Sequence, residues 1–140
     1  MRKEKQAVIE LIKKYKTTNV YELCDCLNID VSFSNIGQLR GFYRYLKRNY
    51  FIVINKNLSE KRREFVCAHE LGHLILHKDE NRILMDTNIH IPNRLENEAN
   101  RFAIYLIFES LEKWQLRDYT NNELSRITGI PLKYLNELNF

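Results

Sequence analysis

The sequence lacks any long hydrophobic run. No stretch of it approaches the roughly 18 apolar residues that a membrane-spanning helix needs, although 44% of the 140 residues are hydrophobic. The first residues, MRKEKQAVIELIKKYK, mix charged and apolar side chains at helical spacing, without the continuous apolar segment and small-residue cleavage site of a secretory leader. These absences predict a cytoplasmic protein with no membrane partner.

Cysteine is scarce as well. The chain has three cysteines, at positions 24, 26 and 67, and this odd number does not suggest a disulfide framework. The C-x-C spacing of Cys24 and Cys26 is too short for half of a zinc knuckle, in which two residues usually separate the thiols. Cys67 lies on the other side of a helix from His69, where a small buried thiol is expected. We predict three reduced cysteines without a metal role.

The chain also lacks a basic stripe interleaved with aromatic residues, a pattern typical of nucleic-acid-binding surfaces. Its formal net charge is +4, but the basic clusters lie beside glutamates, as they do on solvated helix faces. The clusters are Arg2/Lys3/Lys5, Lys13/Lys14/Lys16, Lys47/Arg48 and Lys61/Arg62/Arg63. Direct binding to nucleic acid is therefore not expected from the charge pattern.

The length and composition fit a single domain over residues 1–140, large enough to bury about two-thirds of its unfolded surface. The predicted parts are N-terminal helices over 1–28, a core over 29–111 and a helical tail over 112–140. Apolar residues alternate with polar ones from residue 29, and the segments 41–47 and 50–55 are strand-like on either side of a turn. We predict an α+β fold with a small three-stranded sheet, antiparallel or mixed.

Polar residues that can cap helices mark most of the other elements. Ser59 can start a helix over about residues 60–77, and Pro92 with Asn93 precedes another over about 94–111. In the N-terminal part, Asn19 can cap a short helix that Asn28 ends. The tail has a capping box at Thr120 and Glu123, a break at Gly129, and Pro131 at the start of a last helix.

The helix over 60–77 contains the motif HELGH. Its histidines, His69 and His73, lie one helical turn apart on one face, so both rings can reach a single tetrahedral zinc ion at about 2.0 Å. Glu70, about 100° around the helix, can instead take a proton from a water molecule that attacks a carbonyl. Gly72 would let another backbone or a substrate approach closely. The motif predicts a zinc-dependent peptide hydrolase.

Zinc in such a site needs a third protein ligand. Asp79 has the spacing of an extended motif, but position 76 is leucine where that motif requires a glycine turn. A second helix offers Glu96 and Glu98. Glu96 shares its face with Ala99, Asn100 and Ala103, which allow close approach, and Asn100 could hold the tautomer of a ligand histidine. Glu98 shares its face with two arginines and is expected in solvent. This pattern favours Glu96 and leaves Glu98 open.

The sequence has two further histidines. His77 lies about 12 Å of helix rise from His69, too far to join the same zinc shell, and we interpret it as a helix-end cation or a packing residue. His90 precedes Pro92 and is a weaker candidate for an oxyanion-stabilising group.

The segments RREFVCAHELGHLILH and LENEANRFAIYLI, with the upstream LRGFYRYLKRNYFIVINKNLSEKRR, resemble the ImmA/IrrE family of metallo-endopeptidases, a gluzincin-type group. This resemblance implies one Zn²⁺ per chain held by His69, His73 and Glu96, with Glu70 as general base and Asn100 at the family's Asn/Asp position. It also implies an anti-repressor that cleaves a helix-turn-helix transcriptional repressor. The family's Leu-Leu-x-Pro-like run after the second segment is replaced by YLIFES.

Two other classes of function remain open at this level. The tail segment NNELSRITGIPLKYLNEL has the outline of a helix-turn-helix, but its last helix offers few groups for phosphate contacts. We interpret it as a packing unit or a dock for the substrate protein, with DNA binding as the alternative. A protein-binding module with a non-catalytic metal site is the other alternative, and the presence of Glu70 argues against it.

Overall fold

The computed structural model describes residues 1–78 and 91–138, and its sheet has three strands. These are β1 (Ile29–Ser34), β2 (Gly41–Leu46) and β3 (Asn49–Asn55). The strand order is β1-β3-β2, with β1 parallel and β2 antiparallel to the central β3. The predicted small three-stranded sheet is confirmed, and it is mixed.

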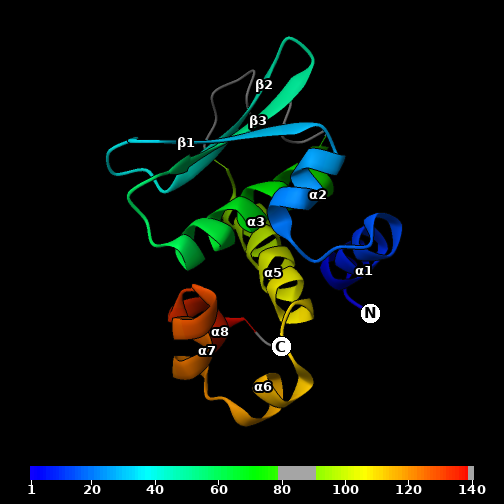
Figure 1. Ribbon diagram of the computed structural model, residues 1–140, viewed down its shortest axis with the longest axis vertical. Coiled ribbons are helices and arrows are strands. Elements are labelled where there is room, and N and C mark those ends of the chain that lie inside the picture. Colours follow the sequence, from blue (N-terminus) through cyan, green and yellow to red (C-terminus); the bar gives the residue numbers. More distant parts are fainter. Residues whose placement is uncertain (79–90, 139–140) are drawn as a thin grey trace.

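The turn between β2 and β3 follows from local backbone geometry. Its two central residues, Lys47 and Arg48, both have positive φ angles, 50° and 68°. Two left-handed residues in a two-residue loop match the right-handed twist of antiparallel strands. On β3, Ile52 and Ile54 alternate with more exposed residues and are completely buried, so one face of the sheet rests on the helices below it (Figure 1).

Two N-terminal helices, α1 (Lys3–Tyr15) and α2 (Val20–Cys26), precede the sheet. The side chain of Asn19 accepts hydrogen bonds from the backbone N–H groups of Tyr21 and Glu22 and so caps α2. Asn28 follows α2 with a φ of 59°, the left-handed conformation expected for the residue that ends this helix. Helix α1 packs mainly on α5 (Asn93–Glu109), which follows later in the chain.

Helices α3 (Glu60–Leu76) and α5 (Asn93–Glu109) form the centre of the molecule, beneath the sheet (Figure 1). Ser59 caps α3 by accepting a hydrogen bond from the N–H of Arg62. The two helices approach closely at Gly72, where an added Cβ would lie 3.1 Å from the carbonyl oxygen of Ala99 and 3.0 Å from the ring of Phe102. The close approach expected at Gly72 is therefore an approach of the α5 backbone.

The tail consists of α6 (Lys113–Asp118), α7 (Asn121–Thr128) and α8 (Leu132–Glu137). The capping box of Thr120 and Glu123 is present, and Gly129 ends α7 with a φ of 80°. A Cβ at Gly129 would lie only 2.4 Å from the backbone carbonyl group of Lys61. The turn between α7 and α8 therefore docks on the first turn of α3. Helix α6 was not predicted from the sequence; its signal is a capping box formed by Glu112 and Gln115.

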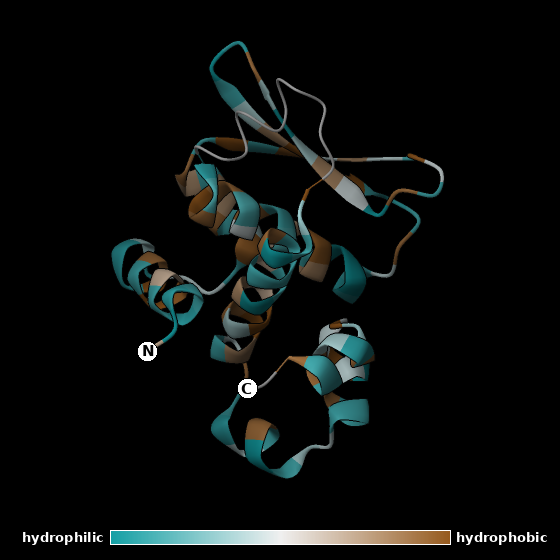
Figure 2. Cartoon of the chain, turned by 180° about the vertical axis from the view of Figure 1, so that it is seen from behind, coloured by the Kyte–Doolittle hydropathy of each residue, from teal (hydrophilic) through white to brown (hydrophobic). Residues whose placement is uncertain are grey.

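The core lies between the sheet, α3 and α5. Its completely buried side chains include Leu23, Leu71, Phe102 and Ile104. Figure 2 shows hydrophobic and hydrophilic residues on each of the central helices, the pattern of helices that bury one face. No helix within the described residues is long and apolar enough to cross a membrane. The predicted α+β architecture is confirmed.

The described cysteines are all free thiols. Cys24 on α2 and Cys67 on α3 are completely buried, and their sulfur atoms lie 3.9 Å apart. Cys67 faces this part of the core because it lies on the opposite side of α3 from His69.

Candidate metal centre

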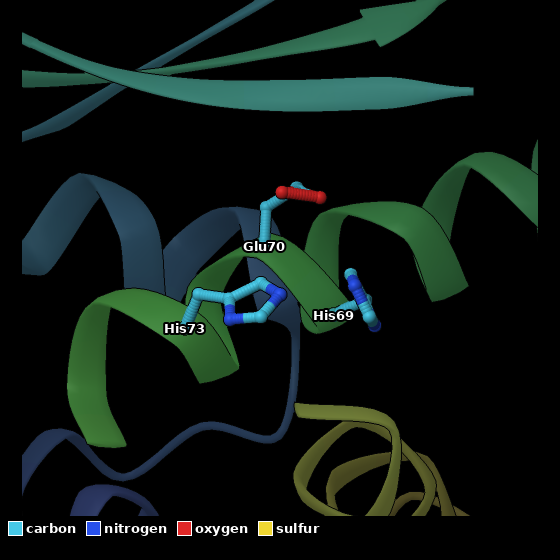
Figure 3. Close-up of side chains that lie close together, drawn as sticks. All are labelled: His69, Glu70 and His73. Atoms are coloured by element: carbon cyan, nitrogen blue, oxygen red, sulfur yellow. The ribbon is translucent and has the colours of Figure 1, made fainter. Parts of the chain in front are cut away.

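Helix α3 brings together the three side chains of the HELGH motif that were predicted to carry the chemistry. One ligand atom from each of His69, Glu70 and His73 lies within 4.8 Å of the others, a group able to hold a metal ion. Figure 3 shows the two imidazole rings along one side of the helix and Glu70 extending towards a neighbouring strand. The ring centroids are 4.8 Å apart and nearly perpendicular, at 88°.

Helix α5 supplies a carboxylate to the same point. Oε1 of Glu96 lies 2.6 Å from Nε2 of His73, and Oε2 lies 3.5 Å from Nε2 of His69. Both histidines therefore direct the same ring nitrogen, Nε2, at one carboxylate. His73 is almost completely buried, whereas the Glu96 side chain is 38% exposed. The carboxylate from α5 therefore reaches solvent, whereas the imidazole behind it does not.

The other nitrogen of His69 is held by Asn100. Its Nδ1 lies 2.6 Å from Oδ1 of Asn100, one helical turn after Glu96 on α5. An amide oxygen only accepts hydrogen bonds, so Nδ1 of His69 carries a hydrogen, and Nε2 is the nitrogen left to bind a metal when the ring is neutral. Asn100 thus selects the tautomer of His69 that can bind a metal through Nε2.

Glu98 does not lie in solvent, contrary to the expectation from helical spacing. It is 5% exposed, and its carboxylate contacts Nζ of Lys3 at 2.5 Å and Nη1 of Arg94 at 3.4 Å. The expectation was wrong because helix α1 packs over this face of α5, a contact that the periodicity of α5 alone does not reveal. Glu98 also contacts Nε2 of His77 at 3.4 Å.

Two residues that lie beside the site were not predicted from the sequence to be there. His77, interpreted as a helix-end cation or packing residue, is 2% exposed and lies with its Nδ1 3.3 Å from Nδ1 of His73. Tyr43 on β2 is 8% exposed, and its ring centroid is 5.3 Å from that of His73. Strand alternation in GFYRYL would have placed Tyr43 on the inner face but not next to the metal motif. Asp79 and His90 lie outside the described residues.

The electrostatic environment differs among the acidic groups. Burial raises the pKa of Glu70 to about 7; the charge of His69 opposes this rise, and the charge of Glu96 adds a smaller increase. Burial also acts against ionisation of Glu96, but hydrogen bonds to His69 and His73 hold the pKa of that carboxyl well below its usual range. Glu96 is therefore ionised, while Glu70 is poised near neutrality.

The two histidines also differ in pKa. Burial lowers the pKa of His73 despite its hydrogen bond to Glu96. Burial has the same tendency at His69, but its hydrogen bond to Glu96 and the charge of Glu70 outweigh it and raise the pKa. A neutral imidazole and an ionised carboxylate are the forms that bind metals, and His73 and Glu96 are in these forms.

The donor set fits zinc. Two imidazole nitrogens and one carboxylate that converge on one point are a common zinc shell in hydrolytic sites, where the fourth position stays open. The second nitrogen of each imidazole already has a partner, Asn100 for His69 and His77 for His73. The Nε2 atoms are therefore the ones that remain for a metal.

Comparisons with known proteins agree with this chemistry. The sequence profile of the IrrE N-terminal-like domain, peptidase family M78, matches residues 24–133. An uncharacterized immunity region protein of Bacillus phage phi105 is 43% identical over 146 aligned positions, which cover 96% of this chain and 90% of the phage protein. The metallopeptidase ImmA of Bacillus subtilis (strain 168) is 39% identical over 106 positions, covering 74% of this chain and 62% of ImmA.

Proposed function

Because the chain belongs to the IrrE N-terminal-like family of metallopeptidases, we propose that it is a zinc-dependent endopeptidase. In this proposal His69, His73 and Glu96 hold the zinc ion. The observation that carries the proposal is the convergence of both Nε2 atoms on the Glu96 carboxylate, at 2.6 Å and 3.5 Å. Asn100 acts through His69, whose Nδ1 hydrogen it accepts.

Glu70 is the proposed general base. When bound, zinc acts as a Lewis acid that polarises the substrate carbonyl and makes water more acidic. Glu70 takes a proton from the attacking water and delivers it to the leaving amine of the cleaved peptide bond. A pKa raised by burial to about 7 suits both steps, because the group can accept and release a proton near neutral pH.

The proposed substrate is a helix-turn-helix transcriptional repressor. The similarity to a phage immunity region protein, over almost the whole of both chains, supports a role in the control of a phage or mobile element. The family resemblance of HELGH and ENEAN supports the same role, that of an anti-repressor. The partly exposed Glu96 leaves access for a protein substrate on the α5 side of the site.

The test is incubation of the purified protein with the repressor encoded beside it, followed by mass spectrometry of the fragments. We expect one or a few defined cleavage products with zinc present, none after treatment with a chelator, and recovery when zinc is added back. An intact repressor under all three conditions would contradict the proposed substrate. Fragments that persist after complete zinc removal would contradict the metal dependence.

A further inference from the structure

The structure contains a chain of buried polar contacts behind His73, on the side away from Glu96. Nδ1 of His73 lies 3.3 Å from Nδ1 of His77. Nε2 of His77 lies 3.4 Å from Oε2 of Glu98. His77 and Glu98 are 2% and 5% exposed. These contacts link the last turn of α3 to α5 through side chains that the proposed mechanism does not use.

The hydrogens in this series of contacts can be assigned by starting from Glu98. The carboxylate of Glu98 contacts Nζ of Lys3 at 2.5 Å and a guanidinium nitrogen of Arg94. Next to two cations it is an acceptor only. The hydrogen between His77 and Glu98 must therefore be on Nε2 of His77.

The position of the hydrogen on the His73 ring follows from that on His77. A neutral imidazole with its hydrogen on Nε2 has an acceptor at Nδ1. Nδ1 of His77 can therefore only accept, so Nδ1 of His73 must donate. When a metal takes the lone pair of Nε2 of His73, the nitrogen that lies 2.6 Å from Glu96, the hydrogen of that ring is on Nδ1, as this assignment requires; without a metal, Nε2 donates to the ionised Glu96 instead.

We propose that His77 is a positioning residue for the metal centre: it accepts the Nδ1 hydrogen of His73 and is itself oriented by Glu98. The proposal rests on the zinc-binding function proposed above and extends it to a role that mirrors that of Asn100 behind His69. It also gives α1 a part in the site, because Lys3 holds the Glu98 carboxylate from that helix.

The first test is the zinc affinity of His77→Phe, measured by competition with a chelator of known affinity. Loss of a partner of this kind typically weakens metal binding about 10- to 100-fold, and we expect a loss in that range. His77→Asn keeps an acceptor near the position of Nδ1 and should recover part of the affinity. Thr128→Val, which removes a comparably buried hydroxyl whose hydrogen bonds stay within α7 and the turn after it, should bind zinc like the wild type.

A second pair of variants distinguishes the loss of the His77–Glu98 contact from general damage to the α1–α5 interface. Glu98→Ala and Glu4→Ala each remove a buried carboxylate that pairs across this interface, Glu98 with Lys3 and Glu4 with Arg101. We expect weaker zinc binding in Glu98→Ala only. Equal zinc affinities in the two variants would overturn the role assigned to Glu98.

The third test needs no variant. In the zinc-loaded wild-type protein, ¹⁵N NMR of the histidine rings should show His77 as a neutral ring with its hydrogen on Nε2. A hydrogen on Nδ1, or a protonated ring, would overturn the proposal, as would unchanged zinc affinity in His77→Phe. Absence of zinc binding in the wild-type protein would contradict the proposed function itself. The zinc affinity of His77→Phe and the NMR result test only the role of His77.

Discussion

At the scale of the residue, the site separates two carboxylates into different roles. Glu96 contacts both histidines and has a lowered pKa, whereas Glu70 is buried and has a pKa raised to about 7. An ionised carboxylate suits a metal ligand, and one poised near neutral pH suits proton transfer. The two glutamates should therefore respond to substitution in different ways.

For Glu70→Gln we expect wild-type zinc stoichiometry and a fall in cleavage rate of about 100-fold or more. The amide has nearly the same shape but cannot accept the proton of the attacking water. Zinc content is measured by elemental analysis and cleavage by fragment formation. Loss of zinc from this variant would show that Glu70 is a ligand rather than a base.

For Glu96→Ala we expect loss of bound zinc, because two imidazoles alone make an incomplete shell. Glu109→Ala is the control, since it removes an exposed carboxylate from the end of the same helix. The measurement is zinc per chain after dialysis. Retention at the wild-type ratio in Glu96→Ala would rule out this ligand.

At the scale of the element, α8 packs against α3, the helix that carries the HELGH motif. Tyr134 stacks on Phe65 with ring centroids 6.1 Å apart, and Phe65 lies next to His69 at 6.4 Å. Gly129 brings α7 and α8 against the backbone of Lys61. The tail that resembles a helix-turn-helix in sequence thus packs on α3, as one of the two interpretations expected.

Gly129→Ala should release this packing. The added methyl group would overlap backbone atoms 2.4 Å away, in a left-handed conformation that alanine adopts poorly. We expect a loss of about 3 kcal/mol in the free energy of unfolding, measured by denaturant titration. Gly37→Ala is the matched control, because Gly37 has a φ of 65° and no atom within 4 Å of the added Cβ. It should cost about 1 kcal/mol, and equal losses in both variants would contradict the packing role of Gly129.

At the scale of the whole molecule, the proposed metal joins the two central helices. Its ligands come from α3 and α5, the helices on which the sheet, α1 and the tail also rest. A ligand that binds only the folded state stabilises it by mass action. Metal binding and global stability should therefore be coupled.

We expect free zinc at about 100 times its dissociation constant to add about 2.7 kcal/mol to the stability. For a chain of this length that corresponds to a rise in Tm of roughly 5 to 10 °C. Differential scanning calorimetry with and without a chelator measures it. Glu70→Gln should show the same rise as the wild type and Glu96→Ala none, and a zinc-independent Tm in the wild type would contradict the coupling.

The local parts of the fold could be predicted from the sequence because their causes are local. Asn19, Ser59 and Thr120 cap helices by hydrogen bonds to backbone groups two or three residues away. Likewise, the spacing of HELGH puts two imidazoles on one face of any helix that contains it. The short helix α6 escaped prediction because its capping box uses Glu112 and Gln115, which are less typical of such signals.

Long-range contacts decided the rest. Helical spacing shows which residues of α5 share a face but not which face another helix covers, so the burial of Glu98 under α1 could not be foreseen. The parallel pairing of β1 with β3 depends on how the chain crosses the core, and strand alternation does not specify it. The sequence by itself determined the metal-binding motif and most of the helices and strands. Only the tertiary structure decided that Glu96 faces the two histidines and that His77 and Glu98 lie behind one of them.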